Sequence, residues 1–223
     1  MNSLDIIINY HAAIVRGLGA TLLICSSAWS LGIIFGTTLG YFAQKRKMLA
    51  RILAACSLFT ISVPAIVLLF WLYYPAQAIL GIALDPLLTT IIAMSIIDII
   101  LMGDLIKKAL DNFPTQYESA ARVCGMAESK IFIKIKLPII FRQVLPGVIN
   151  LKISILHMSL FGSLISVEEI FRIAQQINAQ IYRPVEIYTA LGLLFLGMSL
   201  PLNLLAAYFK RRFTRDLSEE TYA

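Results

Sequence analysis

Five apolar runs, each long enough to cross a bilayer as a helix, constrain the fold of this chain more than any other feature. A spanning helix needs ~20 predominantly apolar residues, and inside the hydrocarbon core a helix satisfies its own backbone hydrogen bonds. The chain is 59% hydrophobic and only 14% charged over 223 residues, too apolar for a soluble domain. We therefore predict an all-α polytopic membrane protein forming a single domain over residues 1–223. Its five transmembrane helices are expected at about 17–42, 52–74, 87–106, 144–165 and 187–209.

The basic residues gather on one side of this arrangement. Most of the 19 Lys and Arg residues follow the first, third or fifth run. Because segments rich in Lys and Arg stay in the cytoplasm, we expect the N-terminus outside and the C-terminus inside. A net charge of +6 then reflects topology and lipid headgroups, so no nucleic-acid partner is expected. The cytoplasmic set is Lys45, Arg46, Lys47, Arg51; Lys107, Lys108, Arg122, Lys130, Lys134, Lys136, Arg142; and Lys210, Arg211, Arg212, Arg215.

The longest polar passage lies between the third and fourth runs, at residues 107–143. Pro114 can begin a helix there, because its missing N–H would be unpaired at that position anyway, and Gly125 is a natural helix stop. Glu118 and Arg122 lie four residues apart and support an exposed side. The helical spacing also predicts one face made of small side chains and a single aromatic ring: Tyr117, Ala120, Ala121 and Cys124.

Such a face is suited to lie in a groove of another protein, because small residues permit close backbone approach. The alternative is a basic amphipathic connector on the membrane surface. Residues 130–137 alternate apolar and polar side chains, a pattern that fits a strand as well as a helix. We interpret them as an interfacial helix because Pro138 and another apolar run follow closely.

Several residues within the runs are candidates for function, because ionisable groups and irregular backbone are costly at membrane depth. Asp98 and His157 could contact a polar substrate or each other, or form structural contacts. Lys152 is expected to snorkel or to pair with an acid. The segment 62–64, with Ser62 and Pro64, either lines a pathway or only bends the second helix.

Small residues form a stripe on the first predicted helix. Gly32, Gly36 and Gly40 are each four residues apart, so they share one face where another helix can approach closely. The sequence leaves open whether that helix belongs to the same chain or to a second subunit. The three cysteines are scattered, so neither a disulfide framework nor a metal site is expected: Cys25, Cys56 and Cys124.

The polar passage resembles the EAA loop of ABC importer permeases, whose pattern is E-A-A-x-x-x-G-x9-I-x-L-P. Here Ser119-Ala120-Ala121 is followed by Gly125 and, nine residues later, by Ile135-x-Leu137-Pro138. The likeness extends over nearly the whole chain and is greatest to five-span permeases for polar amino acids, including the histidine, arginine, lysine and glutamine types. The chain departs from the pattern at Ser119, where the family has its glutamate. Glu118, one residue earlier, is a possible substitute.

The resemblance implies a pathway subunit in the bacterial inner membrane that binds no cofactor or metal and carries no catalytic residue. It implies a dimer with a second copy or a homologous permease, ABC ATPase subunits that hold ATP and Mg²⁺, and an extracytoplasmic substrate-binding protein. The implied ATPase-coupling residues are Glu118, Ser119, Ala120, Ala121, Arg122, Gly125 and Pro138. The implied substrate-pathway residues are Ser62, Pro64, Asp98, His157 and Ser159.

Two other classes of protein fit the sequence less well. A channel or secondary transporter would leave the polar loop unexplained, and no inverted repeat is detectable. An intramembrane enzyme lacks a nucleophile motif, and Asp98 and Asp104 do not share a helical face. Co-purification of an ATPase subunit distinguishes these classes.

Overall fold

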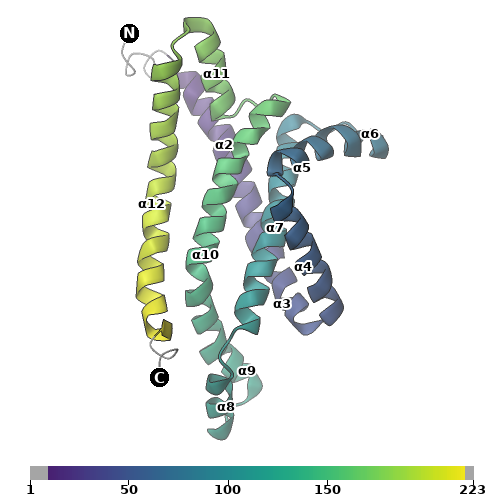
Figure 1. Ribbon diagram of the computed structural model, residues 1–223, viewed down its shortest axis with the longest axis vertical. Helices are drawn as coiled ribbons and strands as arrows, with labels where there is room; N and C mark the ends of the chain where they lie inside the picture. The colour runs from purple at the N-terminus through teal and green to yellow at the C-terminus, as the bar shows by residue number, and fades with distance from the viewer. Residues whose placement is uncertain (1–9, 219–223) are drawn as a thin grey trace.

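The computed structural model describes residues 10–218, with side chains described up to residue 213. Within this part of the chain every regular element is helical, and most helices run along one long axis (Figure 1). The elements are α2 (His11–Leu31), η1 (Gly32–Gly36), α3 (Thr37–Lys45), α4 (Lys47–Ser62), α5 (Ala65–Trp71), η2 (Leu72–Ala76), α6 (Gln77–Leu80), α7 (Pro86–Asp111), α8 (Thr115–Val123), α9 (Glu128–Ile131), η3 (Phe132–Lys136), α10 (Leu137–Met158), η4 (Ser159–Ile165), α11 (Ile170–Ile181) and α12 (Pro184–Ser218).

Four of the described helical rods are long and apolar enough to cross a membrane. They cover His11–Lys45, Pro86–Asp111, Glu128–Ile165 and Pro184–Phe213. The runs expected at 17–42, 87–106, 144–165 and 187–209 lie inside them, so each rod extends beyond the apolar run that predicted it.

The second run does not form one continuous helix. α4 ends at Ser62, α5 begins at Ala65, and the two halves are bent by 103°, which turns α5 and α6 away from the bundle axis (Figure 1). Val63 is extended, as expected for a residue before proline, and Pro64 supplies no N–H to continue the helix. The helix predicted over 52–74 is therefore interrupted, and its halves count as a fifth span only when taken together.

Helix α7 is the centre of the fold and packs against α2, η1, α3, α4 and α10. Its start is fixed by Asp85, whose carboxylate accepts hydrogen bonds from the N–H groups of Leu87 and Leu88. The core beside it is apolar and draws on α2, α5, α7, α10 and η4; it includes Ile24, Ala28, Leu69, Met94, Ile97, Ile155 and Ile165.

The glycine stripe of the first rod packs against α7 within the same chain. A Cβ on Gly36 would lie 2.7 Å from the Met102 side chain, and one on Gly40 would lie 2.5 Å from the Gly103 carbonyl oxygen. Both distances are too short for real contacts, so these positions require glycine. The question that the sequence left open is thus settled in favour of packing within the subunit.

Residues 130–137 are helical, and the strand alternative is wrong. α9, η3 and α10 continue into one another as a single rod that starts at Glu128, well before the predicted start of the fourth span. The helix preferred from the sequence is confirmed. The pattern alternates because Ile133 and Lys134 are both exposed near the end of the molecule, where a helix need not bury a continuous apolar face.

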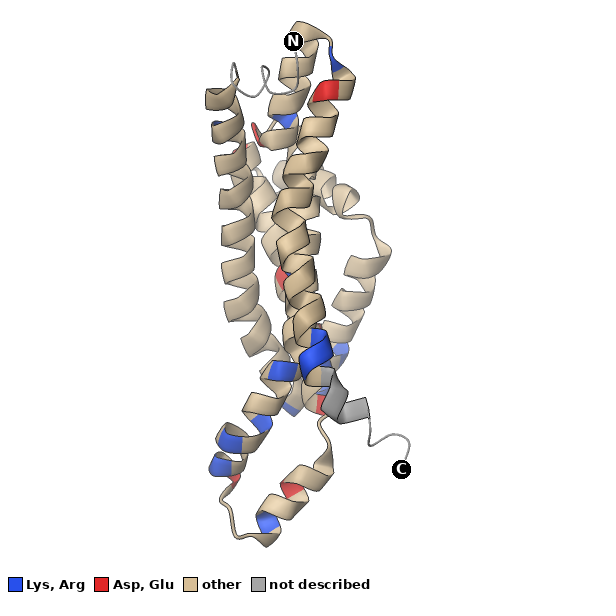
Figure 2. Cartoon of the chain, turned by 90° about the vertical axis from the view of Figure 1, so that its left-hand side faces the viewer, with Lys and Arg blue, Asp and Glu red and all other residues tan. Residues whose placement is uncertain are grey.

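Most of the described Lys and Arg residues lie at the end of the molecule that carries α8 and α9 (Figure 2). The turn between α3 and α4 and the last turns of α12 lie toward the same end. Arg215, counted with this group in the sequence, lies outside the described side chains.

Candidate functional site

Helix α8 projects beyond the bundle at its basic end, between α7 and α9 (Figure 1). Phe113 anchors the entry to it, being only 5% exposed with the Tyr117 ring 6.1 Å away. Pro114 is extended and precedes the first helical residue, Thr115. The sequence predicted that Pro114 itself begins the helix; the helix begins one residue later, with Pro114 as its N-cap.

The end of α8 is fixed by Gly125, which has φ +73°. Its N–H donates to the Arg122 carbonyl at 2.9 Å, and the Met126 N–H donates to the Ala121 carbonyl at 3.1 Å. These two bonds form a Schellman motif and satisfy the last carbonyls of the helix. A Cβ here would meet no neighbour within 4 Å, so glycine is needed for the backbone conformation and not for space.

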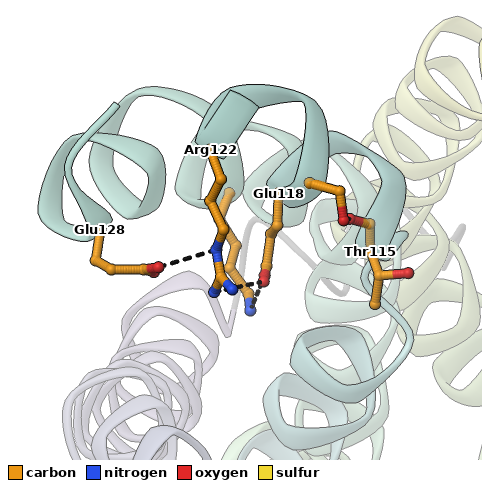
Figure 3. Close-up of polar contacts among 6 residues, drawn as sticks. Thr115, Glu118, Arg122 and Glu128 are labelled. Atoms are coloured by element: carbon orange, nitrogen blue, oxygen red, sulfur yellow. Dashed lines mark hydrogen bonds and ion pairs between the residues drawn. The ribbon is translucent and has the colours of Figure 1, made fainter. Parts of the chain in front are cut away.

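Two ion pairs hold α8 against the start of the fourth rod. Lys136 Nζ lies 2.6 Å from Glu118 Oε1 and 5.3 Å from the centre of the Phe113 ring. Arg122 Nε donates to Glu128 Oε1 at 2.9 Å, and its guanidinium lies beside Glu118 (Figure 3). The Glu118–Lys136 pair is the more sheltered, with side chains 24% and 18% exposed. Together the pairs fix α8 relative to the membrane-embedded rods.

The predicted docking face is divided between the two sides of α8. Ala121 is 5% exposed and Tyr117 packs on Phe113, so both face this chain. Ala120 and Cys124 are exposed, together with Val123, which is 89% exposed. The surface that another protein can reach is therefore narrower than the sequence indicates.

The structure also separates the roles of Glu118 and Ser119. Ser119 is exposed, and its hydroxyl donates to the Thr115 carbonyl at 3.1 Å. Glu118 points to Lys136 instead of outward. Glu118 therefore braces the loop from inside, while Ser119 occupies the outward position. Pro138 is exposed in the first turn of α10, two residues after the Lys136 that pairs with Glu118.

Within the bundle, Asp98 pairs with Lys152 and not with His157. Asp98 is fully buried, and its Oδ2 accepts a hydrogen bond from Lys152 Nζ at 2.5 Å. Gly32 makes room for this carboxylate, because any Cβ there would overlap Oδ2. The Trp29 indole donates to the Lys152 carbonyl at 3.2 Å, which ties α2 to the same point on α10. Lys152 thus pairs with an acid, one of the two alternatives the sequence allowed.

The other predicted pathway residues differ in their exposure. Ser159 is fully buried, and its hydroxyl donates to the Leu156 carbonyl at 2.8 Å. His157 is exposed on α10, with its ring 6.4 Å from the Phe195 ring of α12. Ser62 and Pro64 are exposed at the break between α4 and α5. Asp98 and Ser159 therefore do not face an open surface in this conformation, whereas His157, Ser62 and Pro64 do.

A stripe of polar residues on α10 went unnoticed in the sequence. Its members are all exposed on one face of α10, and we name it the α10 polar stripe: Gln143, Asn150, Ser154 and His157. Their spacing of seven, four and three residues fits helical periodicity, so the sequence did contain the signal. A polar face on a membrane helix needs a partner helix or water, because lipid offers no hydrogen bonds.

A buried carboxylate at the opposite end of the bundle was also missed. Glu169, in the connection between η4 and α11 and outside the candidate spans, is 0% exposed and caps α11 by accepting from the N–H groups of Phe171 and Arg172. Burial raises the pKa of Glu169 to about 7, against the lowering effect of these N–H groups and of the Thr21 hydroxyl. Thr21 also accepts from the Ile170 N–H at 3.2 Å, so α2 and α11 meet at this carboxylate.

The fold and these features define a polytopic helical membrane protein that presents a braced helix at its basic end. Residues 32–215 match the family of binding-protein-dependent transport system inner membrane components, and the chain belongs to this family. Among the described residues, no cluster of His, Cys, Asp and Glu could hold a metal ion.

Curated relatives carry names from amino acid and opine transport. The chain is 26% identical to the glutamate/aspartate import permease protein GltK of Escherichia coli O157:H7, over 89% of this chain and 92% of that one. It is 27% identical to the L-cystine transport system permease protein TcyB of Bacillus subtilis, over 70% and 67%. The octopine transport system permease protein OccM of Rhizobium meliloti is 33% identical, but the match covers only 44% of this chain and 40% of OccM.

Solved structures share the fold at low sequence identity. A chain from the crystal structure of an amino acid ABC transporter with histidines has a TM-score of 0.82 at 21% identity, covering 95% of this chain and 99% of that chain. A chain of the inward-facing MetNI methionine ABC transporter has a TM-score of 0.71 at 20% identity, covering 92% and 98%.

Proposed function

We propose that this chain is the transmembrane permease subunit of an ATP-driven ABC importer for polar amino acids. It lines the translocation pathway as a dimer, with a second copy or a homologous permease, and performs no chemistry itself. ATPase subunits that hold ATP and Mg²⁺ dock on its cytoplasmic end, and a substrate-binding protein docks outside. Family membership and the names of the relatives support this role and the amino acid class.

The observation that carries the proposal is the braced position of α8. Its exposed residues, Ser119, Ala120 and Val123, form a face that can dock in a groove of an ATPase subunit. Helix α8 lies at the end of the molecule where the basic residues gather (Figure 2). Because Glu118 and Arg122 tie α8 to the fourth rod, a push on α8 moves α10 with it. Basic loops favour the cytoplasm, so we place this end inside and the N-terminus outside.

Substrate would pass along the α10 polar stripe. His157, Asn150 and Ser154 offer hydrogen-bonding groups to a polar amino acid, and all three are open in the isolated chain. Ser62 and Pro64 stand at a helix break, where irregular backbone is tolerated when it faces a cavity. An alanine variant of His157 should lose transport while assembly and basal ATP hydrolysis persist; unchanged uptake kinetics would remove His157 from the pathway.

The proposal is tested by replacing Ala120 with aspartate in the complex of permease and ATPase subunits, reconstituted in vesicles with the binding protein. The negative charge on the exposed face of α8 should leave the complex assembled but uncouple ATP hydrolysis from amino acid uptake. Gly125→Asp should do the same by straining the helix stop at φ +73°. Ser129→Asp adds the same charge at an exposed position outside α8 and should retain uptake. Normal coupling in Ala120→Asp would contradict the proposal.

A further inference from the structure

A groove opens between the first rod and α7 on the flank that carries the α3–α4 turn. Its volume is 610 Å³, within the ~300–1,000 Å³ typical of small-molecule sites. Thr38 lines it too, but its hydroxyl donates back to the helix, to the Ile34 and Phe35 carbonyls. The other wall residues, apart from Arg46, are apolar: Phe35, Leu39, Phe42, Leu49 and Ile99.

The groove follows the first rod from the α3–α4 turn toward its middle. Arg46 lies at the turn between α3 and α4, and Phe35 lies eleven residues earlier in the same rod. At ~1.5 Å per helical residue, Phe35 lies about 16 Å along the rod from Arg46, a length that is about half of a ~30 Å hydrocarbon core. The length of the groove therefore corresponds to the acyl region of one leaflet.

Arg46 lines the groove at the α3–α4 turn, which marks the mouth of the groove. Four basic residues lie at or next to this turn, and none forms an ion pair within the described part of the chain: Lys45, Arg46, Lys47 and Arg51. Lys45 donates only to the Tyr41 hydroxyl. Four described carboxylates at this end of the molecule are already engaged by other bases. These pairs are Asp104–Lys108, Asp111–Lys107, Glu118–Lys136 and Glu128–Arg122. This turn thus carries a concentrated positive charge with no counter-ion among the residues that the structure describes.

We propose that this groove is a binding site for one anionic phospholipid of the basic-end leaflet, with an acyl chain against Phe42 and Leu39 and the headgroup at Arg46. An anionic headgroup supplies the missing counter-charge, and the apolar wall accepts the chain. A second copy of this protein fits poorly, because a symmetric contact would bring the same four cations against each other. The inference rests on placement in the membrane and not on transport activity.

The test uses the complete complex of permease and ATPase subunits in nanodiscs of phosphatidylcholine into which phosphatidylglycerol is titrated. Native mass spectrometry then counts the lipids that stay bound. We expect a retained phosphatidylglycerol for each copy of this chain and no comparable retention of phosphatidylcholine. Arg46→Gln should weaken phosphatidylglycerol retention about fivefold, which corresponds to the ~1 kcal/mol that each basic residue contributes near an anionic surface.

Two further variants separate a built site from general surface charge. Lys210→Gln removes one exposed cation from the same end but from α12, on the other side of the bundle from α3 (Figure 1), and should leave retention unchanged. Thr38→Trp fills the groove without changing any charge and should lower retention as Arg46→Gln does. Basal ATP hydrolysis, measured on the same samples, shows that the variants are folded and keeps this test apart from that of the proposed function.

Three outcomes would overturn the inference. Equal retention of the two lipids would show ordinary annular lipid, and an equal loss in Arg46→Gln and Lys210→Gln would show a diffuse surface effect. A photoreactive residue at position 38 that cross-links a second copy of the chain would show that the groove is a protein interface.

Discussion

At the scale of single residues, the buried ion pair of Asp98 and Lys152 has a large desolvation cost in the bundle interior. Both charges are buried, and the second carboxylate oxygen of Asp98 is buried without a hydrogen-bond partner. Burying an ion pair costs desolvation that the attraction between the charges barely offsets, while removing one partner leaves an uncompensated charge. Gly32 is part of the same arrangement, because it lets α2 and α7 approach around the carboxylate.

We expect Asp98→Leu and Lys152→Leu to destabilise the protein separately, by roughly 3–5 kcal/mol each, and much less together. The double variant removes both charges, so it should recover most of the lost stability. Thermal unfolding of the purified complex in one detergent measures the cycle. Strictly additive losses would show that the two side chains do not interact.

Glu169 gives the stability of the protein a dependence on pH. The folded state holds this proton up to pH about 7, whereas an unfolded chain releases it near the ordinary glutamate value of 4.5. The folded state therefore binds more protons between these values, and the free energy of unfolding should fall as pH rises from about 4.5 to 7. At ~1.4 kcal/mol per pKa unit, the loss is on the order of 3 kcal/mol.

Glu169→Gln should flatten this dependence, because the amide keeps a neutral side chain in the same buried position. Melting temperatures of the variant and the wild type, measured across pH 4.5–8, provide the comparison. The neighbouring Glu168 is exposed, so Glu168→Gln is a matched control and should retain the wild-type slope. Parallel curves for Glu169→Gln and the wild type would contradict the assignment.

At this scale the sequence identified ionisable residues whose burial in the membrane is costly, but it did not identify their partners. Asp98 stood out because a carboxylate at membrane depth is expensive. Its choice of Lys152 over His157 depends on how α7 and α10 are rotated about their axes, which no local pattern specifies. Nothing in the sequence indicated that Glu169 is buried, because its burial results from the approach of α2 to the start of α11.

At the scale of elements, α8 was predicted closely because its limits are encoded locally. Pro114 and Gly125 act through backbone geometry, so their effect is visible in sequence. The sequence did not show which side of α8 faces outward, because that depends on Phe113 and Lys136, which lie outside α8. The break at Pro64 was predicted in position, but its 103° angle depends on the packing of α5 against α7.

Breaking the Glu118–Lys136 pair should loosen the connection between α8 and α10. We expect Lys136→Met to retain ATP hydrolysis but to lower the amount of amino acid taken up per ATP several-fold in reconstituted vesicles. Reversing the pair with Glu118→Lys and Lys136→Glu together should restore much of the coupling, because the attraction survives the exchange. Arg122→Gln, which removes a pair whose side chains are 58% and 73% exposed, should have a small effect. A similar loss in all three would indicate a general disturbance of the loop.

At the scale of the whole molecule, the described chain leaves large surfaces without a partner. Much of α12 is exposed, and the α10 polar stripe has amide and imidazole groups open along the fourth rod, where the Ser154 hydroxyl donates to the Asn150 carbonyl. Acyl chains cannot satisfy such groups, so this face must meet water or another subunit. The flank with the lipid groove differs, because its wall is apolar and its charges lie at the surface. The two faces therefore have different expected neighbours.

A photoreactive residue can distinguish those neighbours within native membranes. With p-benzoylphenylalanine in place of Ser154, we expect cross-links to a permease subunit, and the mass of the product tells whether it is a second copy or a homologous chain. The same residue in place of Thr38, on the groove flank, should yield lipid adducts instead. Cross-links to lipid alone from position 154 would mean that the polar stripe faces the bilayer. That result would refute the dimeric pathway, because no second subunit would then cover the face on which the pathway depends.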